Sequence, residues 1–352
     1  MIKYYKTIVF ANSILKDSFR FENEFQILPV NMDGKPYCPF ARHFPVFLEY
    51  TMEYIKGEHN NTFKLIADGE TKIREILNLL SCLTNHRFFR YDTSNNAWGL
   101  KMPNKLADEM SKNELQDLDK EESSYFMANY VYNGLTEDLK IEHFTSPATP
   151  CIFLNNTNHR YYIDNPIDDY THTISFPDTL HNALECYYNL TNKTRLKVNA
   201  CIYLACDGMD ISAHKKSLSF LSYVSAIEGL VNLECDDDEI KFACGCCKVI
   251  ESSPYKCPEC GRLIWGIKQK FINFLSKFVV NSEKSKMKYR DIYNLRSKLT
   301  HTGKLFVSDY EFSFSNEGFE TDNNDSLMGL ETLQLFRISL DCWLRYPQKR
   351  KK

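Results

Sequence analysis

An arginine and a histidine five residues apart, Arg296 and His301, lie in the segment YRDIYNLRSKLTHTG near the end of the chain. A histidine imidazole can take the proton from a ribose 2′-hydroxyl, so that the hydroxyl oxygen attacks the adjacent phosphorus. A guanidinium can hold the phosphoryl oxygens as negative charge builds on them. The pair therefore suits phosphoryl chemistry on RNA, a reaction that needs no metal ion.

The residues around this pair are basic, whereas the whole chain has a formal net charge of −3. Any site for a polyanion must therefore be a local patch. Between residues 284 and 304 a single acid, Asp291, is outnumbered by basic residues: Lys284, Lys286, Lys288, Arg290, Lys298 and Lys304. The residues expected to bind the substrate are Lys288, Arg290, Ser297, Lys298 and Lys304. Tyr289 and Tyr293 could stack on bases, but burial is expected for at least one of them.

The spacing of apolar residues predicts a helix with the pair in its last turns. The expected core-facing residues are Ile292, Leu295 and Leu299, so Arg296 and His301 should lie off that stripe. Gly303 stands where a left-handed residue ends a helix, which places His301 in the last turn. Five helical residues rotate by about 140° and rise about 7.5 Å, so the two side chains do not stack. The arginine must reach across, the helix must unwind near Gly303, or two copies of the chain must share one site.

A second group of residues with evident chemistry is the cysteine-rich segment FACGCCKVIESSPYKCPECGRLIW, which holds five of the 13 cysteines. Two C-x2-C pairs are separated by nine residues: Cys244 with Cys247, and Cys257 with Cys260. Four thiolates complete a tetrahedral shell without an open position, so we expect a structural Zn²⁺ in a ribbon inserted at residues 242–263. Cys246 could replace Cys244 or Cys247. The odd cysteine count favours reduced thiols over a disulfide framework.

Both groups fall in the second of two expected domains. Residues 1–168 mix β-prone runs (TIVF, CIFL, HRFFRY) with helix-like stretches (FPVFLEYTMEYIKG, ETKIREILNLLSCL), which is typical of an α+β domain. The charged stretch 105–124 is read as a solvated helix or a loop. Turn-forming residues near 155–170 mark the boundary. Residues 169–352 predict an all-α bundle with helices at 176–190, 213–233, 266–280, 287–303 and 325–344, the first capped by Asp178.

The composition is that of an ordinary soluble protein, with 43% hydrophobic and 25% charged residues. Membrane spans need about 18 or more apolar residues, and no run approaches that length. The N-terminus lacks the features of an export signal. These features predict a cytoplasmic protein without a membrane partner.

The segment YNLRSKLTHTG resembles the Arg-x4-6-His signature of HEPN domains. The order of HKKSLSFLSYVSAIEGLVNL, a four-cysteine insert, KFINFLSKF and the Arg/His helix is most similar to the ApeA-like HEPN proteins of bacterial anti-phage defence, over about residues 175–345. The resemblance implies an all-α HEPN bundle that forms a homodimer. It also implies a metal-independent endoribonuclease toxin that cleaves tRNA or other cellular RNA during abortive infection and leaves 2′,3′-cyclic phosphate ends.

The same resemblance assigns roles to individual residues. His301 would be the acid/base and Arg296 the phosphate-stabilising group. Ser297 departs from the Asn, Asp or His that the family often has after the arginine, which leaves its role open. Glu228 matches the acidic residue of the family's EGL-like stretch and is read as a structural or supporting group. The N-terminal domain would sense a phage-derived trigger or restrain the nuclease by analogy alone.

Two alternatives stay open. The chain could be a non-catalytic nucleic-acid or protein binding module that uses the zinc ribbon and the basic helix. The Arg/His pair could instead serve only to build a dimer interface. The histidines of the first domain are not spaced like metal ligands: His43, His59, His86, His143 and His159.

Overall fold

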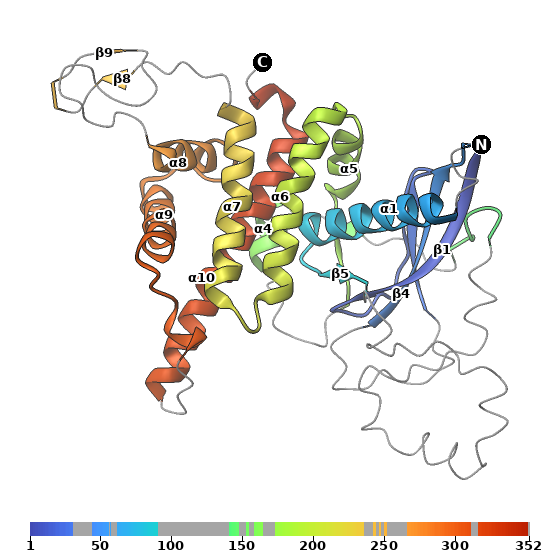
Figure 1. Ribbon diagram of the computed structural model, residues 1–352, viewed down its shortest axis with the longest axis horizontal. Coiled ribbons are helices and arrows are strands. Elements are labelled where there is room, and N and C mark those ends of the chain that lie inside the picture. Colours follow the sequence, from blue (N-terminus) through green and yellow to red (C-terminus); the bar gives the residue numbers. More distant parts are fainter. Residues whose placement is uncertain are drawn as a thin grey trace, which may run out of the picture. The chain divides into compact units, whose positions relative to one another are not determined.

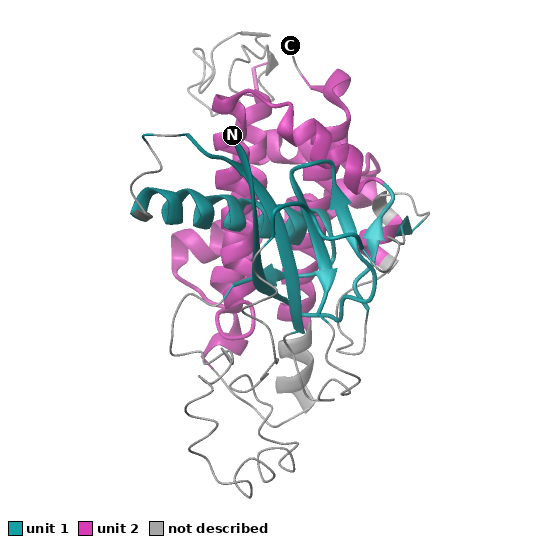
Figure 2. Cartoon of the chain, turned by 90° about the vertical axis from the view of Figure 1, so that its right-hand side faces the viewer, with its two compact units in different colours: residues 1–155, 165–178 teal, residues 156–164, 179–352 magenta. Residues whose placement is uncertain are grey.

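A computed structural model of the protein describes most of the chain (Figure 1). The described residues are 1–30, 44–55, 57, 62–90, 141–147, 153–154, 158–164, 173–235, 242–243, 246–247, 250–251, 266–310 and 316–350. They belong to two compact units: unit 1 is Met1–Asn155 with Asn165–Asp178, and unit 2 is Asn156–Asp164 with Thr179–Lys352 (Figure 2). The predicted boundary between residues 168 and 169 lies inside the second segment of unit 1.

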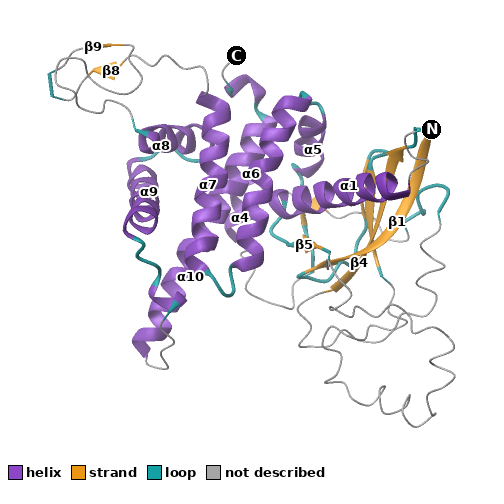
Figure 3. Ribbon diagram, in the orientation of Figure 1, coloured by secondary structure: helices purple, strands orange, loops and turns teal. Residues whose placement is uncertain are grey.

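Unit 1 is built on a five-stranded antiparallel sheet with the strand order β2-β3-β4-β1-β5 (Figure 3). Its strands are β1 (Ile2–Ala11), β2 (Phe19–Phe21), β3 (Phe25–Pro29), β4 (Phe44–Glu53) and β5 (Phe88–Phe89). One helix, α1 (Thr62–Leu83), and a short parallel pair, β6 (Phe153–Leu154) with β7 (Phe176–Pro177), complete its described part. The predicted α+β class is confirmed for this half. The charged stretch 105–124 lies outside the described residues.

Strand β4 occupies a stretch that was expected to be helical, and that prediction is wrong. The strand pairs with β1 over ten residues, from Ile2 opposite Glu53 to Ala11 opposite Phe44. Its first eight residues are all buried, because β4 lies in the middle of the sheet and both of its faces are covered. A strand buried on both faces shows a nearly continuous apolar run, which does not differ in pattern from a buried helix.

Unit 2 is mostly helical. Its helices are α4 (Asn158–Asp164), α5 (Leu180–Tyr188), α6 (Asn192–Ile211), α7 (Lys216–Cys235), α8 (Ile267–Phe278), α9 (Glu283–Thr302) and α10 (Asn316–Arg345), with the 3-10 turns η2 (Val307–Asp309) and η3 (Pro347–Lys349). Helix α7 contacts α6, α8, α9 and α10, so it forms the centre of the bundle (Figure 1). The predicted core residues of α7 are all buried: Phe220, Val224, Ile227 and Val231.

The five predicted helices are present, but two further helices were missed. Helix α6 buries several small or weakly hydrophobic side chains, such as Cys201, Ala205 and Cys206, so its sequence shows no strong stripe of large apolar residues. Helix α4 lies in the stretch that was read as a turn-rich boundary. The predicted cap on α5 is also wrong, because Thr179 rather than Asp178 precedes that helix, and Thr179 makes no side-chain cap bond.

Two glycines allow α6 and α7 to approach each other closely. A Cβ on Gly208 of α6 would lie 2.6 Å from Cε1 of Tyr223 and 3.1 Å from the carbonyl oxygen of Ser219. A Cβ on Gly229 of α7 would lie 2.5 Å from Sγ of Cys201. Real Cβ atoms essentially never come within 3.0 Å of a neighbour, as a Cβ at each of these two positions would, so the helix pair depends on both glycines.

We expect Gly208→Ala to lower the free energy of unfolding by about 1–3 kcal/mol, because the new methyl group overpacks the contact with α7. Gly329→Ala on α10 is the matched control, since a Cβ there would meet nothing within 4 Å. The control should gain about 0.5–1 kcal/mol from helix propensity. Urea unfolding measures both changes, and equal effects at the two glycines would contradict the packing argument.

Candidate active site

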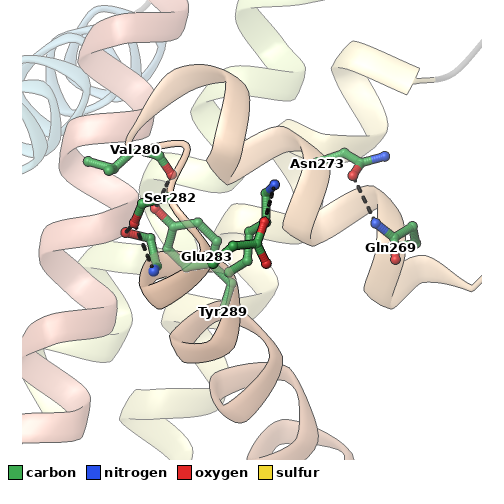
Figure 4. A network of polar contacts seen from close by, with 8 residues as sticks. Gln269, Asn273, Val280, Ser282, Glu283 and Tyr289 are labelled. Carbon is green, nitrogen blue, oxygen red and sulfur yellow. Dashed lines mark hydrogen bonds and ion pairs between the residues drawn. The ribbon is translucent and has the colours of Figure 1, made fainter.

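The first turns of helix α9, which carries Arg296 and His301, are held by a side-chain cap, an ion pair and a hydrogen bond to the preceding segment. Ser282 caps it by accepting the backbone N–H of Ser285 at 3.1 Å, and Glu283 in the first turn pairs with Lys286 at 3.0 Å. The Tyr289 hydroxyl donates to the carbonyl oxygen of Val280 at 3.1 Å and ties the helix to the segment after α8 (Figure 4). The helix therefore starts at Glu283, one turn before its predicted start near residue 287.

Arg296 makes an ion pair with Glu228 of α7. Its Nη2 donates to Oε2 of Glu228 at 3.2 Å, and its Nη1 donates to Oγ1 of Thr300 at 3.3 Å. The arginine and glutamate side chains are only 23% and 13% exposed. Arg296 was expected to lie outside the buried stripe of α9, but it lies at the edge of that stripe. Leu295 was expected to face the core and is only half-buried.

The ion pair has an aromatic neighbour and a polar atom without a partner. The guanidinium carbon lies 5.9 Å from the ring centre of Tyr293, which packs against Phe271 of α8. Burial raises the pKa of Tyr293; the negative charge of Glu228 raises it further, while Arg296 lowers it. Among the described residues, Oε1 of Glu228 is buried without a hydrogen-bond partner. The charge of the largely buried Glu228 carboxylate is therefore compensated by the guanidinium of Arg296.

His301 is exposed in the last turn of α9. The helix stays regular through Thr302 and ends at Gly303, whose φ of +65° is the predicted left-handed conformation. Unwinding of the helix, one of the three ways to bring Arg296 and His301 together, is therefore not observed before His301. Two ways remain: the arginine side chain reaches across to the histidine, or two copies of the chain share one site.

The predicted substrate-binding residues fall into different environments. Lys288 is engaged in an ion pair with Glu331 of α10 at 2.7 Å. Ser297 is half-buried. The exposed members are Arg290, Lys298 and Lys304. Of the two tyrosines, Tyr289 is buried, and Tyr293 is half-buried beside Arg296.

Two residues next to the pair were not assigned a place from the sequence. Lys268 of α8 donates to Oδ1 of Asn294 on α9 at 2.6 Å, which adds a cation beside the basic helix. Thr300 donates its hydroxyl to the carbonyl oxygen of Arg296 at 2.5 Å and accepts from its guanidinium. A threonine four residues after an arginine is too common a pattern to reveal this role in advance.

The cysteine-rich segment contains a short hairpin. Strands β8 (Phe242–Ala243) and β9 (Ile250–Glu251) pair antiparallel, and Cys246 and Cys247 lie exposed in the turn between them. A C-x2-C sequence in a hairpin turn fits one half of a zinc site. Cys244, Cys257 and Cys260 lie outside the described residues, so the zinc ribbon stays a prediction. In the part of the chain that the structure describes, no group of three or more side chains could hold a metal ion.

Six cysteines outside this segment lie in the described part of the chain. Cys186 and Cys235 are half-buried, and the buried ones are Cys82, Cys201, Cys206 and Cys342. Burial raises the pKa of Cys201 to about 12, which keeps that thiol protonated at neutral pH.

His86 has a structural place in unit 1. Its Nε2 accepts the backbone N–H of Ser175 at 3.2 Å, so Nδ1 carries the proton and donates to Oγ of Ser13 at 3.1 Å. His143 is exposed, and the side chains of the other three predicted non-ligands lie outside the described residues: His43, His59 and His159.

Comparison of the chain with protein-family models, with curated proteins and with solved structures finds no match. Within the described ranges, none of the helices combines the length and the apolar character needed to cross a bilayer.

The half-buried ion pair generates a stability prediction. Arg296→Met and Glu228→Gln should each destabilise the protein, because each leaves a partly buried polar group without its partner. The double variant should lose less than the sum, with a coupling energy of about 1–3 kcal/mol from urea unfolding.

The Lys288–Glu331 pair is the matched control for this cycle, because its side chains are 43% and 42% exposed. Lys288→Met with Glu331→Gln should show a coupling below about 1 kcal/mol. Coupling of the same size in both cycles would show that burial does not strengthen the Arg296–Glu228 pair.

Proposed function

We propose that the protein is a metal-independent endoribonuclease of HEPN type, with Arg296 and His301 as its catalytic residues and cellular RNA, tRNA included, as its substrate. The observation that carries the proposal is the ion pair between Arg296 and Glu228 at 3.2 Å. It holds a guanidinium in one orientation, about 1.4 turns of helix before an exposed histidine. Cleavage through the ribose 2′-hydroxyl requires both a fixed cation and an accessible imidazole.

The reaction needs a base and a phosphate-binding cation. His301 takes the proton of the 2′-hydroxyl, and the 2′-oxygen attacks the phosphorus as the bond to the 5′-oxygen breaks. The products are a 2′,3′-cyclic phosphate and a 5′-hydroxyl, and the proton returns to the leaving oxygen. Arg296 stabilises the charge on the nonbridging oxygens, and Glu228 keeps the guanidinium in place. Arg290, Lys298 and Lys304 are exposed and bind flanking phosphates.

A homodimer is part of the proposal. Arg296 turns toward α7, whereas His301 is exposed at the end of the same helix. Their directions differ by about 140° on a regular helix, so a second copy of the chain can bring its own histidine to the arginine more readily than the first copy can. If the α9 helices of two copies met around a two-fold axis, the dimer would hold two sites, each made of Arg296 from one copy and His301 from the other.

The biological role that we propose follows the resemblance to anti-phage HEPN proteins. The nuclease would arrest growth during infection, and unit 1 would sense a phage-derived trigger or restrain the nuclease. A structural Zn²⁺ on Cys244, Cys247, Cys257 and Cys260 would hold the ribbon together, with no part in the reaction.

The second candidate function is a non-catalytic binding module for nucleic acid or protein. It is favoured by the fact that Arg296 already has an intramolecular partner, while Arg290, Lys298 and Lys304 stay exposed. In such a module the basic helix would bind phosphates without cleaving RNA.

Cleavage of total cellular RNA in EDTA separates the two functions. The wild type should give fragments that end in 2′,3′-cyclic phosphate, and Arg296→Ala and His301→Ala should each lower the rate about 100-fold or more. Arg195→Ala on α6 and His143→Ala in unit 1 remove the same residue types elsewhere and should leave the rate unchanged.

Cleavage that persists in the Arg296 or His301 variant would contradict the assigned roles. Failure of the wild type to cleave, both alone and with an extract of infected cells that supplies a trigger, would favour the binding module. RNA affinity, measured by fluorescence anisotropy on the same proteins, should be nearly unchanged in His301→Ala under either function.

Metal analysis tests the predicted ribbon. We expect about one zinc ion per chain by mass spectrometry, lost in Cys257→Ser and removed by a strong chelator with a fall in melting temperature. Cys247→Ser should lose the ion and Cys246→Ser should retain it. The opposite result for these two neighbours would assign the fourth ligand to Cys246, and a zinc-free wild type would contradict the site.

A further inference from the structure

The segment that follows His301 is fastened to the first turn of α7 by a carboxylate. Oδ1 of Asp309 accepts the backbone N–H of Lys216 at 2.7 Å, and Oδ2 accepts that of Ser217 at 2.8 Å. These N–H groups belong to the start of a helix, where they have no partner within the helix. The residue that precedes α7 is Lys215, whose side chain offers no acceptor. The cap therefore comes from a residue more than 90 positions away in the chain.

Three more contacts fix the same segment. The backbone N–H of Phe306 donates to Oγ of Ser217 at 2.7 Å, and Ser217 is fully buried. The buried ring of Phe306 packs on Phe220 of α7 with 5.6 Å between ring centres. The Ser308 hydroxyl donates to Oδ2 of Asp325 on α10 at 2.7 Å. Residues 306–309 are therefore held by backbone, aromatic and polar contacts at once.

The chain is consequently attached to α7 at two places, one on each side of His301. The first is the Arg296–Glu228 ion pair, five residues before the histidine. The second is the cap by Asp309, eight residues after it. Glu228 and Ser217 are 11 residues apart on α7, so the two attachments are separated by about 16 Å along that helix. The histidine backbone is held between two fixed points.

We propose that Asp309 is a positioning residue for His301. By capping α7 it fixes the segment after Gly303 and thereby sets the position of the imidazole at the end of α9. The inference rests on the proposed function, because it assigns to Asp309 a part in the reaction of His301. It adds a residue that does not touch the RNA but controls the rate of its cleavage.

Variants at Asp309 and at an unrelated cap test this role. Asp309→Ala removes both acceptors, Asp309→Asn keeps one, and Thr191→Ala removes the cap of α6, which accepts the backbone N–H of Thr194 at 3.3 Å. All are compared at a temperature at which their circular dichroism spectra coincide. We expect Asp309→Ala to lower kcat about tenfold with KM nearly unchanged, since small displacements of a reacting group have effects of this order or larger. Asp309→Asn should be intermediate, and Thr191→Ala should equal the wild type.

A second readout does not depend on cleavage. The imidazole ring signals of His301, assigned by their loss in His301→Gln, are followed by NMR in full-length protein. Asp309→Ala should shift or broaden them, whereas Thr191→Ala should leave them in place.

The two readouts separate the possible failures. If the wild type does not cleave RNA, the proposed function fails and the NMR signals alone decide whether Asp309 positions His301. If the wild type cleaves and Asp309→Ala keeps both the wild-type kcat and the wild-type His301 signals, the inference is overturned. It is also overturned if Thr191→Ala lowers kcat as much as Asp309→Ala, because the effect would then be general destabilisation.

Discussion

Arg296 and Glu228 join the helix that carries the candidate catalytic pair to the central helix of unit 2, and the rest of the site depends on this contact. A guanidinium that is 23% exposed and a carboxylate that is 13% exposed are partly withdrawn from water, so each needs the charge of the other. Rotation of Arg296 toward solvent would leave Glu228 uncompensated. The arginine is thus held in one orientation, and under the proposed function such preorganised charge is the form in which electrostatic stabilisation speeds a reaction most.

The ion pair can hold a fixed geometry only because α7 itself is fixed. Gly229 follows Glu228 in the sequence and lies so close to α6 that a Cβ would meet Sγ of Cys201 at 2.5 Å. The opposite end of α7 receives its cap from Asp309, and its flanks pack against α8 and α10. Close packing of this kind leaves few alternative positions for a helix. The close approach at Gly229, the ion pair of Glu228 and the cap by Asp309 therefore all restrict the position of α7 beside the candidate site.

Much of the helical unit could be predicted because large apolar residues recur at helical spacing along its helices. Phe220, Val224, Ile227 and Val231 indicated α7, and Gly303 indicated the end of α9. Helix α6 was missed because cysteines, alanine and glycine form most of its buried face. Strand β4 was mistaken for a helix because a strand covered on both faces has no alternation to read.

The candidate site was predictable in its residue types and not in its contacts. The pattern Arg-x4-His indicated phosphoryl chemistry, and the resemblance pointed to Glu228, but the sequence does not show that the two charges meet. Lys288 was expected to bind substrate, yet it pairs with Glu331 of α10, an ion pair that the spacing of residues in the sequence does not reveal. Asp309 carried no signal at all, since an aspartate caps a helix through space and its partners lie more than 90 residues away.

The most direct test of the account uses an RNA oligonucleotide in which one nucleotide, at a mapped cleavage position, carries a 2′-deoxy or 2′-O-methyl sugar. In EDTA, the wild type should cleave the unmodified oligonucleotide to a 2′,3′-cyclic phosphate and leave both modified ones intact at that position, because the attacking hydroxyl is missing. Cleavage of either modified oligonucleotide at that position would contradict the mechanism assigned to Arg296 and His301.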